Sequence, residues 1–481
     1  MNRSAATGFD YLLLAGSVVV IAWGALAFGA VYSWAYTPLA IACAAVGLLA
    51  LIGRRHAGPP IGALALALSA IAGATALQLV PLDAATFARL SPAADAFLRN
   101  YDLHYQVASG AHALSIAPDR TLRAMALFTA FALFLLGTTR LVSKTGAVRL
   151  AQPLVILGTG FALFGIVQAT ALADADGIVK KIYGFWEPRF GGSPFGSFVN
   201  RNHFAGWTIM VLPLAIASVC AAWERASKVS TGDYRDGVSW LSTRSAAGAL
   251  LMTLAAAVMG LALLMTQSRS GMVAFVAAGL MFAWLVVSRQ TSGRAKVVAL
   301  AIVATFFVGA TAWAGFDRIA RRLTDVPITD NPHPTGRLQA WSDTVHIIGD
   351  FPWTGSGLDT YGQAMMIYQT GDRRLHFQEA HNDYLQIAAE GGALVGIPVL
   401  VAVGILVRDV RRRFREAPRQ GTSYWLRVGS VVGLAAIALQ STVEFSLQMP
   451  GNAALFAGVA AIALHRSPNL RPRARGTSPS E

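Results

Sequence analysis

The chain has 481 residues, of which 54% are hydrophobic and only 13% are charged, whereas a soluble protein carries about 25% charged residues. So little charge excludes a water-soluble globule of this length, because the remaining polar surface could not cover the apolar interior. The formal net charge of +14 does not indicate nucleic-acid binding, because the basic residues lie in short runs between apolar blocks.

The apolar residues come in blocks of about 20, the length that crosses a hydrocarbon layer of about 30 Å. Because lipid-facing backbone must satisfy its own hydrogen bonds, each block is expected to be a helix. The first block resembles a secretory signal, but many blocks follow it, which favours an uncleaved span. The sequence therefore predicts an all-α polytopic membrane protein with about twelve transmembrane helices, at 11–30, 37–53, 61–80, 122–139, 150–170, 204–222, 246–266, 271–287, 297–315, 391–407, 424–440 and 453–465.

The distribution of Lys and Arg sets the expected orientation. With the N-terminus in the cytoplasm, more than half of the 39 Lys and Arg residues fall in cytoplasmic segments, which are also the shorter ones. Cytoplasmic loops of membrane proteins carry such an excess. We therefore expect a bacterial inner-membrane protein with both termini in the cytoplasm.

The long segments between spans all fall on the opposite, periplasmic side. Loops of such length are rarely plain linkers, so a function is expected there. The tail is rich in Pro, Arg and Ser and is predicted to be disordered. The expected organisation is spans 1–9 within 1–315 with loops 81–121 and 171–203, a large periplasmic loop at 316–390, spans 10–12 within 391–465, and a cytoplasmic tail at 466–481.

A histidine stands where the longest loop returns to the membrane. Residues 380–386 read Ala-His-Asn-Asp-Tyr-Leu-Gln, and from Asn382 the apolar pattern takes a helical period. This pattern places His381 near a helix start at the outer membrane face. Since the ordinary pKa of histidine is about 6.5, His381 could act as a general base. The alternative is a histidine that only decorates the membrane boundary.

Two arginines lie at the membrane edge on the same side. Arg201 is flanked by two asparagines just before a span, and Arg269 lies in a Ser-Arg-Ser-Gly segment between two spans with almost no loop. A charge at this depth is costly unless it faces a cavity or a partner. Arginine forms bidentate bonds to phosphate and keeps its proton. We therefore predict an anion site for a lipid diphosphate, with Arg337 as a third member; simple interfacial anchoring is the alternative.

A metal site is not predicted. Four possible ligands lie close together in the sequence, but their spacing fits no standard zinc pattern, and no Asp-x-Asp motif is present. Walker A and dinucleotide-binding glycine patterns are also absent from the sequence. The four residues are His376, Glu379, His381 and Asp383.

Taken together, these segments resemble the superfamily of O-antigen ligases and Wzy polymerases. The closing segment 380–391 is similar to the most recognisable stretch of that family, and the segments around Arg201 and Arg269 are similar to its two membrane-edge arginine motifs. Thr335-Gly336-Arg337, Trp341 and Gly355-Ser356-Gly357 fit the start of its large periplasmic loop. Each motif is weak alone, but the ordered set is specific.

The resemblance implies a metal-independent, inverting glycosyltransferase with a GT-C-like fold, a large helical periplasmic loop and no cofactor. The donor would be a glycan on undecaprenyl diphosphate, and the acceptor a lipid A–core or a growing polysaccharide. His381 would deprotonate the acceptor hydroxyl, and Arg201, Arg269 and Arg337 would bind the diphosphate. The residues expected to orient sugars or the histidine are Asn200, Asn202, Tyr384 and Gln386.

Two alternatives stay open. Within the family, ligase and polymerase are equally compatible with the sequence, whereas the short cytoplasmic tail disfavours a protein glycosyltransferase. Outside the family, the chain could be a transporter or flippase for a lipid-linked or anionic solute. A transporter is expected to show charges at mid-bilayer or two similar halves with broken helices, and neither pattern is evident in the sequence.

Overall fold

The computed structural model describes residues 6–52, 62–107, 110–171, 181–188, 193–229, 244–288, 332–371, 373–374, 376–416 and 419–466. Within these ranges the regular elements are helices, and β-structure is limited to isolated bridges. The helices are α1 (Gly8–Leu26), η1 (Phe28–Ala30), α2 (Ser33–Ile52), α3 (Gly62–Leu77), α4 (Ala84–Leu90), α5 (Pro92–Tyr101), α6 (Leu103–Val107), α7 (Pro118–Thr145), α8 (Val148–Ala171), α9 (Arg201–Val229), α11 (Arg244–Met265), α12 (Arg269–Val287), α15 (Pro332–Asp350), α16 (Tyr361–Tyr368), α17 (Asp383–Glu416), α18 (Thr422–Gln440), η2 (Ser446–Gln448) and α19 (Pro450–Leu464).

The prediction of an all-α polytopic membrane protein is confirmed. In the described part of the chain, 9 helices are long and apolar enough to cross a membrane, and α3 and α19 are shorter apolar helices. Each predicted span that falls on described residues coincides with one of these helices. The predicted span 297–315, the first part of the large loop at 316–331 and the tail from 467 lie outside the described residues.

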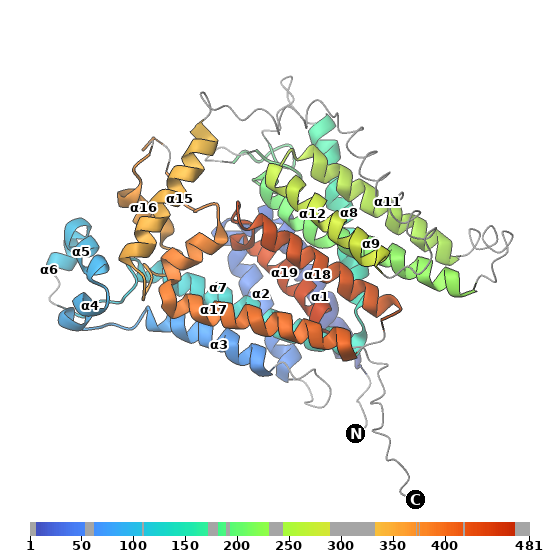
Figure 1. Ribbon diagram of the computed structural model, residues 1–481, viewed down its shortest axis with the longest axis horizontal. Coiled ribbons are helices and arrows are strands. Elements are labelled where there is room, and N and C mark those ends of the chain that lie inside the picture. The colour runs from blue at the N-terminus through green and yellow to red at the C-terminus, as the bar shows by residue number, and fades with distance from the viewer. Residues whose placement is uncertain are drawn as a thin grey trace, which may run out of the picture.

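Close helix crossings at small residues hold the bundle together, as is usual in membranes. A side chain on Gly137 of α7 would overlap the backbone of Gly47 in α2, and Gly451 of α19 meets Gly24 of α1 in the same way. In Figure 1, α18, α19 and α1 occupy the centre between the group α8, α9, α11 and α12 and the group α2, α3, α7 and α17. The central place of α19 agrees with the burial of almost all its residues.

The expected outer loop 81–121 and the described part of the large loop form one helical cap. Their shared apolar core includes Phe87 and Leu98 from the first segment and Ile347, Tyr361 and Met365 from the second. Figure 1 shows α4, α5 and α6 beside α15 and α16, at one end of the bundle. Segments far apart in the sequence therefore lie on the same side, as their predicted topology requires.

The cap is fixed to the bundle through α17. Gln78 donates from Nε2 to the carbonyl oxygens of Thr354 (2.7 Å) and Glu390 (2.9 Å). Gly355 has a φ of +67°, and a Cβ there would overlap the carbonyl of Glu390, so only glycine allows this approach. α17 itself breaks at Gly392, where φ is 54° and ψ is −157°, next to the boundary predicted between the large loop and the tenth span.

The first and last described parts of the chain lie together at the end of the bundle opposite the cap. Lys144 at the end of α7 pairs with Asp10 of α1 at 2.8 Å. The backbone N–H of Arg466 donates to the Ser143 hydroxyl at 3.1 Å. Both expected cytoplasmic segments thus lie on one side of the bundle.

Candidate functional site

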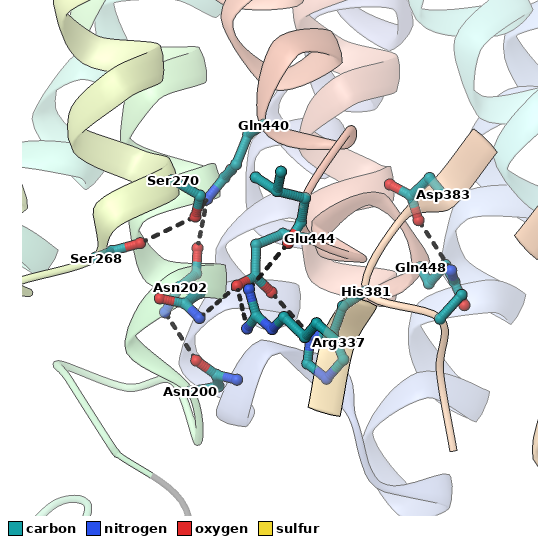
Figure 2. Close-up of polar contacts among 12 residues, drawn as sticks. Asn200, Asn202, Ser268, Ser270, Arg337, His381, Asp383, Gln440, Glu444 and Gln448 are labelled. Atoms are coloured by element: carbon teal, nitrogen blue, oxygen red, sulfur yellow. Dashed lines mark hydrogen bonds and ion pairs between the residues drawn. The ribbon is translucent and has the colours of Figure 1, made fainter. Parts of the chain in front are cut away.

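Five chain segments converge at the cap end of the bundle, where Figure 2 shows their polar side chains. They are the first turns of α9 and α12, α15, the turn that precedes α17, and the turn between α18 and η2. The last two are joined through the backbone, because the Asp383 N–H donates to the Ser441 carbonyl at 3.0 Å. The candidate site is therefore built from segments between about residue 200 and residue 448 of the chain.

Glu444 is the centre of this convergence. Only 1% of its side chain is exposed. Its Oε1 accepts hydrogen bonds from Asn202 Nδ2 at 2.7 Å and from an Arg337 guanidinium nitrogen at 2.8 Å. Its Oε2 lies 3.4 Å from His381 Nδ1. One carboxyl group thus contacts three of the residues that the sequence singled out.

The surroundings of Glu444 favour its ionised form. Burial by itself would raise the pKa of this carboxyl, but the hydrogen bond with His381 and the charges of Arg337 and His381 hold the pKa below its usual range. A buried carboxylate is stable only when it is paired and hydrogen-bonded. Glu444 is therefore a negative charge fixed beside the imidazole.

The backbone presents His381 in an uncommon conformation. Its φ is 51°, in the left-handed region that histidine visits more readily than most residues. The residue before it is fixed from both sides, since Trp341 Nε1 donates to the Ala380 carbonyl at 2.8 Å and the Ala380 N–H donates to Gln386 Oε1 at 2.9 Å. The residue after it, Asn382, caps α17 by accepting the N–H groups of residues 384 and 385. The backbone of His381 is thus held by its neighbours on either side.

The two arginines that were expected at the membrane edge begin neighbouring helices. Arg201 is the first residue of α9 and Arg269 the first residue of α12, and both side chains are partly buried. The helix starts approach closely, because a Cβ on Gly271 would lie 2.6 Å from the Cβ of Ala205. Helix N-termini favour anions, so two cations and two helix starts face the same end of the bundle.

Gln440 links these two helix starts to α18. Its Nε2 donates to the Asn202 carbonyl at 3.1 Å and lies 3.4 Å from the Ser270 hydroxyl. Ser268 caps α12 by accepting the N–H of Gly271 at 3.2 Å. The arginine-bearing segments and the turn that carries Glu444 are thus one hydrogen-bonded unit (Figure 2).

Arg337, predicted as a diphosphate ligand, makes its described contacts within the protein. One guanidinium nitrogen binds Glu444, and another donates to the Val443 carbonyl at 3.2 Å. One third of the side chain, 33%, is exposed. Arg337 therefore neutralises the buried carboxylate and ties α15 to the turn after α18.

The four predicted orienting residues have different surroundings. The Asn200 side chain accepts the N–H of Asn202 at 2.8 Å at the start of α9, and Asn202 itself binds Glu444. The Tyr384 hydroxyl donates to the Ala438 carbonyl of α18 at 2.8 Å. Gln386 is 3% exposed and is hydrogen-bonded to Ala380. Asn202 and Gln386 therefore support the glutamate and the histidine turn, and Asn200 and Tyr384 fix helix positions beside them.

The sequence interpretation gave no role to Glu444 or Gln440. A signal for Glu444 was present, because it is the only acidic residue between Glu416 and Glu481. In the structure it lies in the turn between α18 and η2. Its partners could not be recognised, because they come from segments more than 60 residues away.

The part of the chain that the structure describes contains no group of three or more His, Cys, Asp or Glu side chains that could hold a metal ion. The acidic side chains beside the histidine turn are engaged with amides: Gln386 Nε2 donates to Glu379 at 2.6 Å, and Gln448 Nε2 donates to Asp383 at 2.9 Å.

Comparison with known families identifies one part of the chain. Residues 254–401 match the Wzy_C family, described as O-antigen ligase. The match includes Arg269, Arg337 and His381, whereas Arg201 and Glu444 lie outside it. A comparison with curated proteins found no match.

Proposed function

We propose, from the match of residues 254–401 to the O-antigen ligase family, that this chain is a membrane glycosyltransferase. It would transfer a glycan from undecaprenyl diphosphate to an acceptor hydroxyl, on lipid A–core or on a growing polysaccharide repeat. The reaction would be inverting and independent of a metal ion. The observation that carries the proposal is the contact of His381 with the buried carboxylate of Glu444, beside two helices that begin with arginine.

The proton transfer follows from the histidine–glutamate contact. With Nδ1 directed at Glu444, the other ring nitrogen, Nε2, is the one that can accept a proton from the acceptor hydroxyl. The positive charge that the imidazole gains is then stabilised by the carboxylate 3.4 Å away. As the proton leaves, the acceptor oxygen forms a bond to the anomeric carbon from the face opposite the diphosphate.

The leaving group is the second half of the reaction. The bond between the anomeric carbon and the diphosphate oxygen breaks with its electron pair, and negative charge grows on the diphosphate. Arg201 and Arg269 would neutralise that charge from the starts of α9 and α12, because guanidinium groups form strong bidentate bonds to phosphate oxygens. Arg337, paired with Glu444, is assigned to the carboxylate rather than to the first contact with phosphate.

The arrangement of the two ends of the bundle supports the proposed location. The cap end, which carries the site, is assigned to the periplasm, and the end with Asp10 and Arg466 to the cytoplasm, in agreement with the distribution of Lys and Arg. The membrane is then the bacterial inner membrane, where lipid-linked glycans present their diphosphate at the interface.

The test is a comparison of the wild-type chain with His381→Ala in a deletion strain. Extracted surface glycans and lipid A–core are separated on a gel, and His346→Ala, which changes an exposed histidine of the cap, serves as the matched control. Loss of glycan transfer in His381→Ala alone, with normal protein level in the membrane, is the expected result. Full activity of His381→Ala would remove the proposed base.

The same gel distinguishes ligase activity from polymerase activity. Long chains that accumulate on the lipid carrier, with none on lipid A, would identify a ligase. Single repeat units in place of long chains would identify a polymerase. A glycan profile that does not change on deletion would contradict both activities and would favour transport of a lipid-linked solute.

A further inference from the structure

Phe445 packs on two histidines. The centroid of its ring is 4.8 Å from that of His381, with an interplanar angle of 85°, and 4.7 Å from that of His203, with an angle of 78°. Both contacts are edge-to-face, the arrangement that aromatic rings favour. Phe445 therefore links the proposed base to a second histidine.

The two ring contacts of Phe445 connect three of the segments that build the site. His203 belongs to the first turn of α9, His381 to the turn before α17, and Phe445 to the turn between α18 and η2. Two successive residues of the turn after α18 therefore contact the same two segments: Glu444 binds Asn202 and His381, and Phe445 packs on His203 and His381. Glu444 supplies the charge, and Phe445 the apolar surface.

His203 is placed to support Phe445 rather than to react. Its side chain is 4% exposed, and its Nε2 has no hydrogen-bond partner among the described residues. Its backbone is fixed, because Asn452 Nδ2 donates to the His203 carbonyl at 3.1 Å. The imidazole of His203 is thus a buried ring that packs on Phe445 from a backbone held in place.

A carboxylate contact alone does not orient an imidazole. The contact with Glu444 places one nitrogen of His381 but leaves the plane of the ring free to turn about the side-chain bonds. A perpendicular aromatic ring in contact with the imidazole removes that freedom. Since a small misplacement of a reacting group can cost about 100-fold in rate, the orientation of the ring plane matters for catalysis.

We propose that Phe445, which also packs on His203, is a positioning residue that fixes the ring plane of His381 for proton transfer. The inference rests on the proposed function of His381 as the base. Phe445 itself touches neither the substrate nor the reacting atoms in this proposal. It differs from Glu444 in acting through shape, so a ring of similar shape should replace it.

The experiment uses the full-length chain reconstituted in lipid vesicles with a lipid-linked glycan donor, and it measures kcat and the KM for donor and acceptor. Phe445→Leu removes the ring but keeps an apolar side chain, and Phe445→Tyr keeps the ring. We expect Phe445→Leu to lower kcat about 10- to 100-fold with both KM values unchanged, and Phe445→Tyr to stay within about threefold of wild type. Phe414→Leu, at the opposite end of the bundle, is the matched control and is expected to leave kcat unchanged.

A second variant tests the positioning inference if Phe445→Leu does not fold. His203→Leu keeps an apolar contact with Phe445 but removes the imidazole ring. It should lower kcat by a smaller factor than Phe445→Leu, again without a change in KM. If wild type is inactive or His381→Ala is fully active, the proposed function fails. If His381→Ala is inactive while folded Phe445→Leu or His203→Leu has the kcat of wild type, the positioning inference is overturned and the base is retained.

Discussion

His381 and Glu444 are separated by 63 residues in the sequence, yet His381 Nδ1 lies 3.4 Å from Glu444 Oε2. The two turns that carry them are tied by the hydrogen bond from the Asp383 N–H to the Ser441 carbonyl. Asn202 and Arg337 bind the second oxygen of the same carboxylate. The proposed base is therefore paired with a glutamate that has no motif of its own.

Glu444→Gln removes the charge of this carboxylate and keeps its size. An amide can still accept from Asn202 and Arg337, but it cannot stabilise a protonated His381. We expect kcat to fall about 100-fold or more, the usual contribution of a general base, with little change in the KM for donor. The measurement is glycan transfer by protein reconstituted in lipid vesicles.

The control for this variant is Glu416→Gln, which alters a carboxylate paired with Arg413 at the end of the bundle far from the site. Activity of Glu444→Gln equal to that of Glu416→Gln would show that the charge next to His381 has no role in the reaction.

Arg201→Lys and Arg269→Lys test the proposed diphosphate site. Lysine keeps the charge but loses the two-pronged geometry of the guanidinium. We expect each variant to lower kcat/KM about tenfold, the value of one charge-assisted hydrogen bond, and the double variant to lose more than either single one. Arg99→Lys, an exposed arginine of the cap paired with Asp95, is the control. Donor turnover is measured by release of undecaprenyl diphosphate, and wild-type values in both variants would place the diphosphate elsewhere.

Glycan transfer is expected to continue in EDTA. The cations proposed to meet the leaving group are guanidiniums, which a chelator does not remove. Purified protein treated with EDTA should keep the activity of the untreated protein, and added Mg²⁺ or Mn²⁺ should not increase it. Loss of activity that one divalent cation restores would contradict the role given to the arginines.

The buried carboxyl of Glu379 should make the free energy of unfolding depend on pH. Burial raises the pKa of this carboxyl from 4.5 to about 8, and the nearby Glu390 acts in the same direction. The folded protein therefore retains a proton that the unfolded chain has released, so the contribution of this group is complete below pH 4.5 and is lost as the pH rises to about 8.

The matching variant is Glu379→Gln, whose amide oxygen can still accept from Gln386. We expect the Tm of the wild-type protein in detergent to fall more steeply between pH 4.5 and about pH 8 than the Tm of Glu379→Gln. Glu187→Gln, an exposed residue, should follow the wild type. Parallel curves for wild type and Glu379→Gln would show that Glu379 titrates normally.

The spans were predictable because their signal is local. A block of about 20 apolar residues must cross the bilayer as a helix wherever it lies, so the helices around 122–139 or 204–222 could be placed without knowledge of their neighbours. The positions of Arg201, Arg269 and His381 at the ends of such blocks could be placed by the same reasoning. All three lie at helix starts or directly before one.

The contacts of the site residues could not be predicted from such local patterns. Arg337 was grouped with the arginines for phosphate, but its partner is Glu444, which lies 107 positions further along the chain. Gln386 was expected to orient sugars or His381, and its contacts turn out to lie within the protein. Such pairings depend on which segments meet when the bundle closes, and a single sequence carries no direct signal for them.

The sequence by itself determined that the chain is a helical membrane protein and which arginines and histidine lie at or near the starts of its apolar helices, because each depends on residue types along one short stretch. The tertiary structure decided that α4, α5, α15 and α16 form one cap, that Glu444 is the partner of His381, and that Phe445 contacts both His381 and His203. These features are contacts between distant segments, and they arise only when α9, α12, α15, α17 and α18 pack at the same end of the bundle.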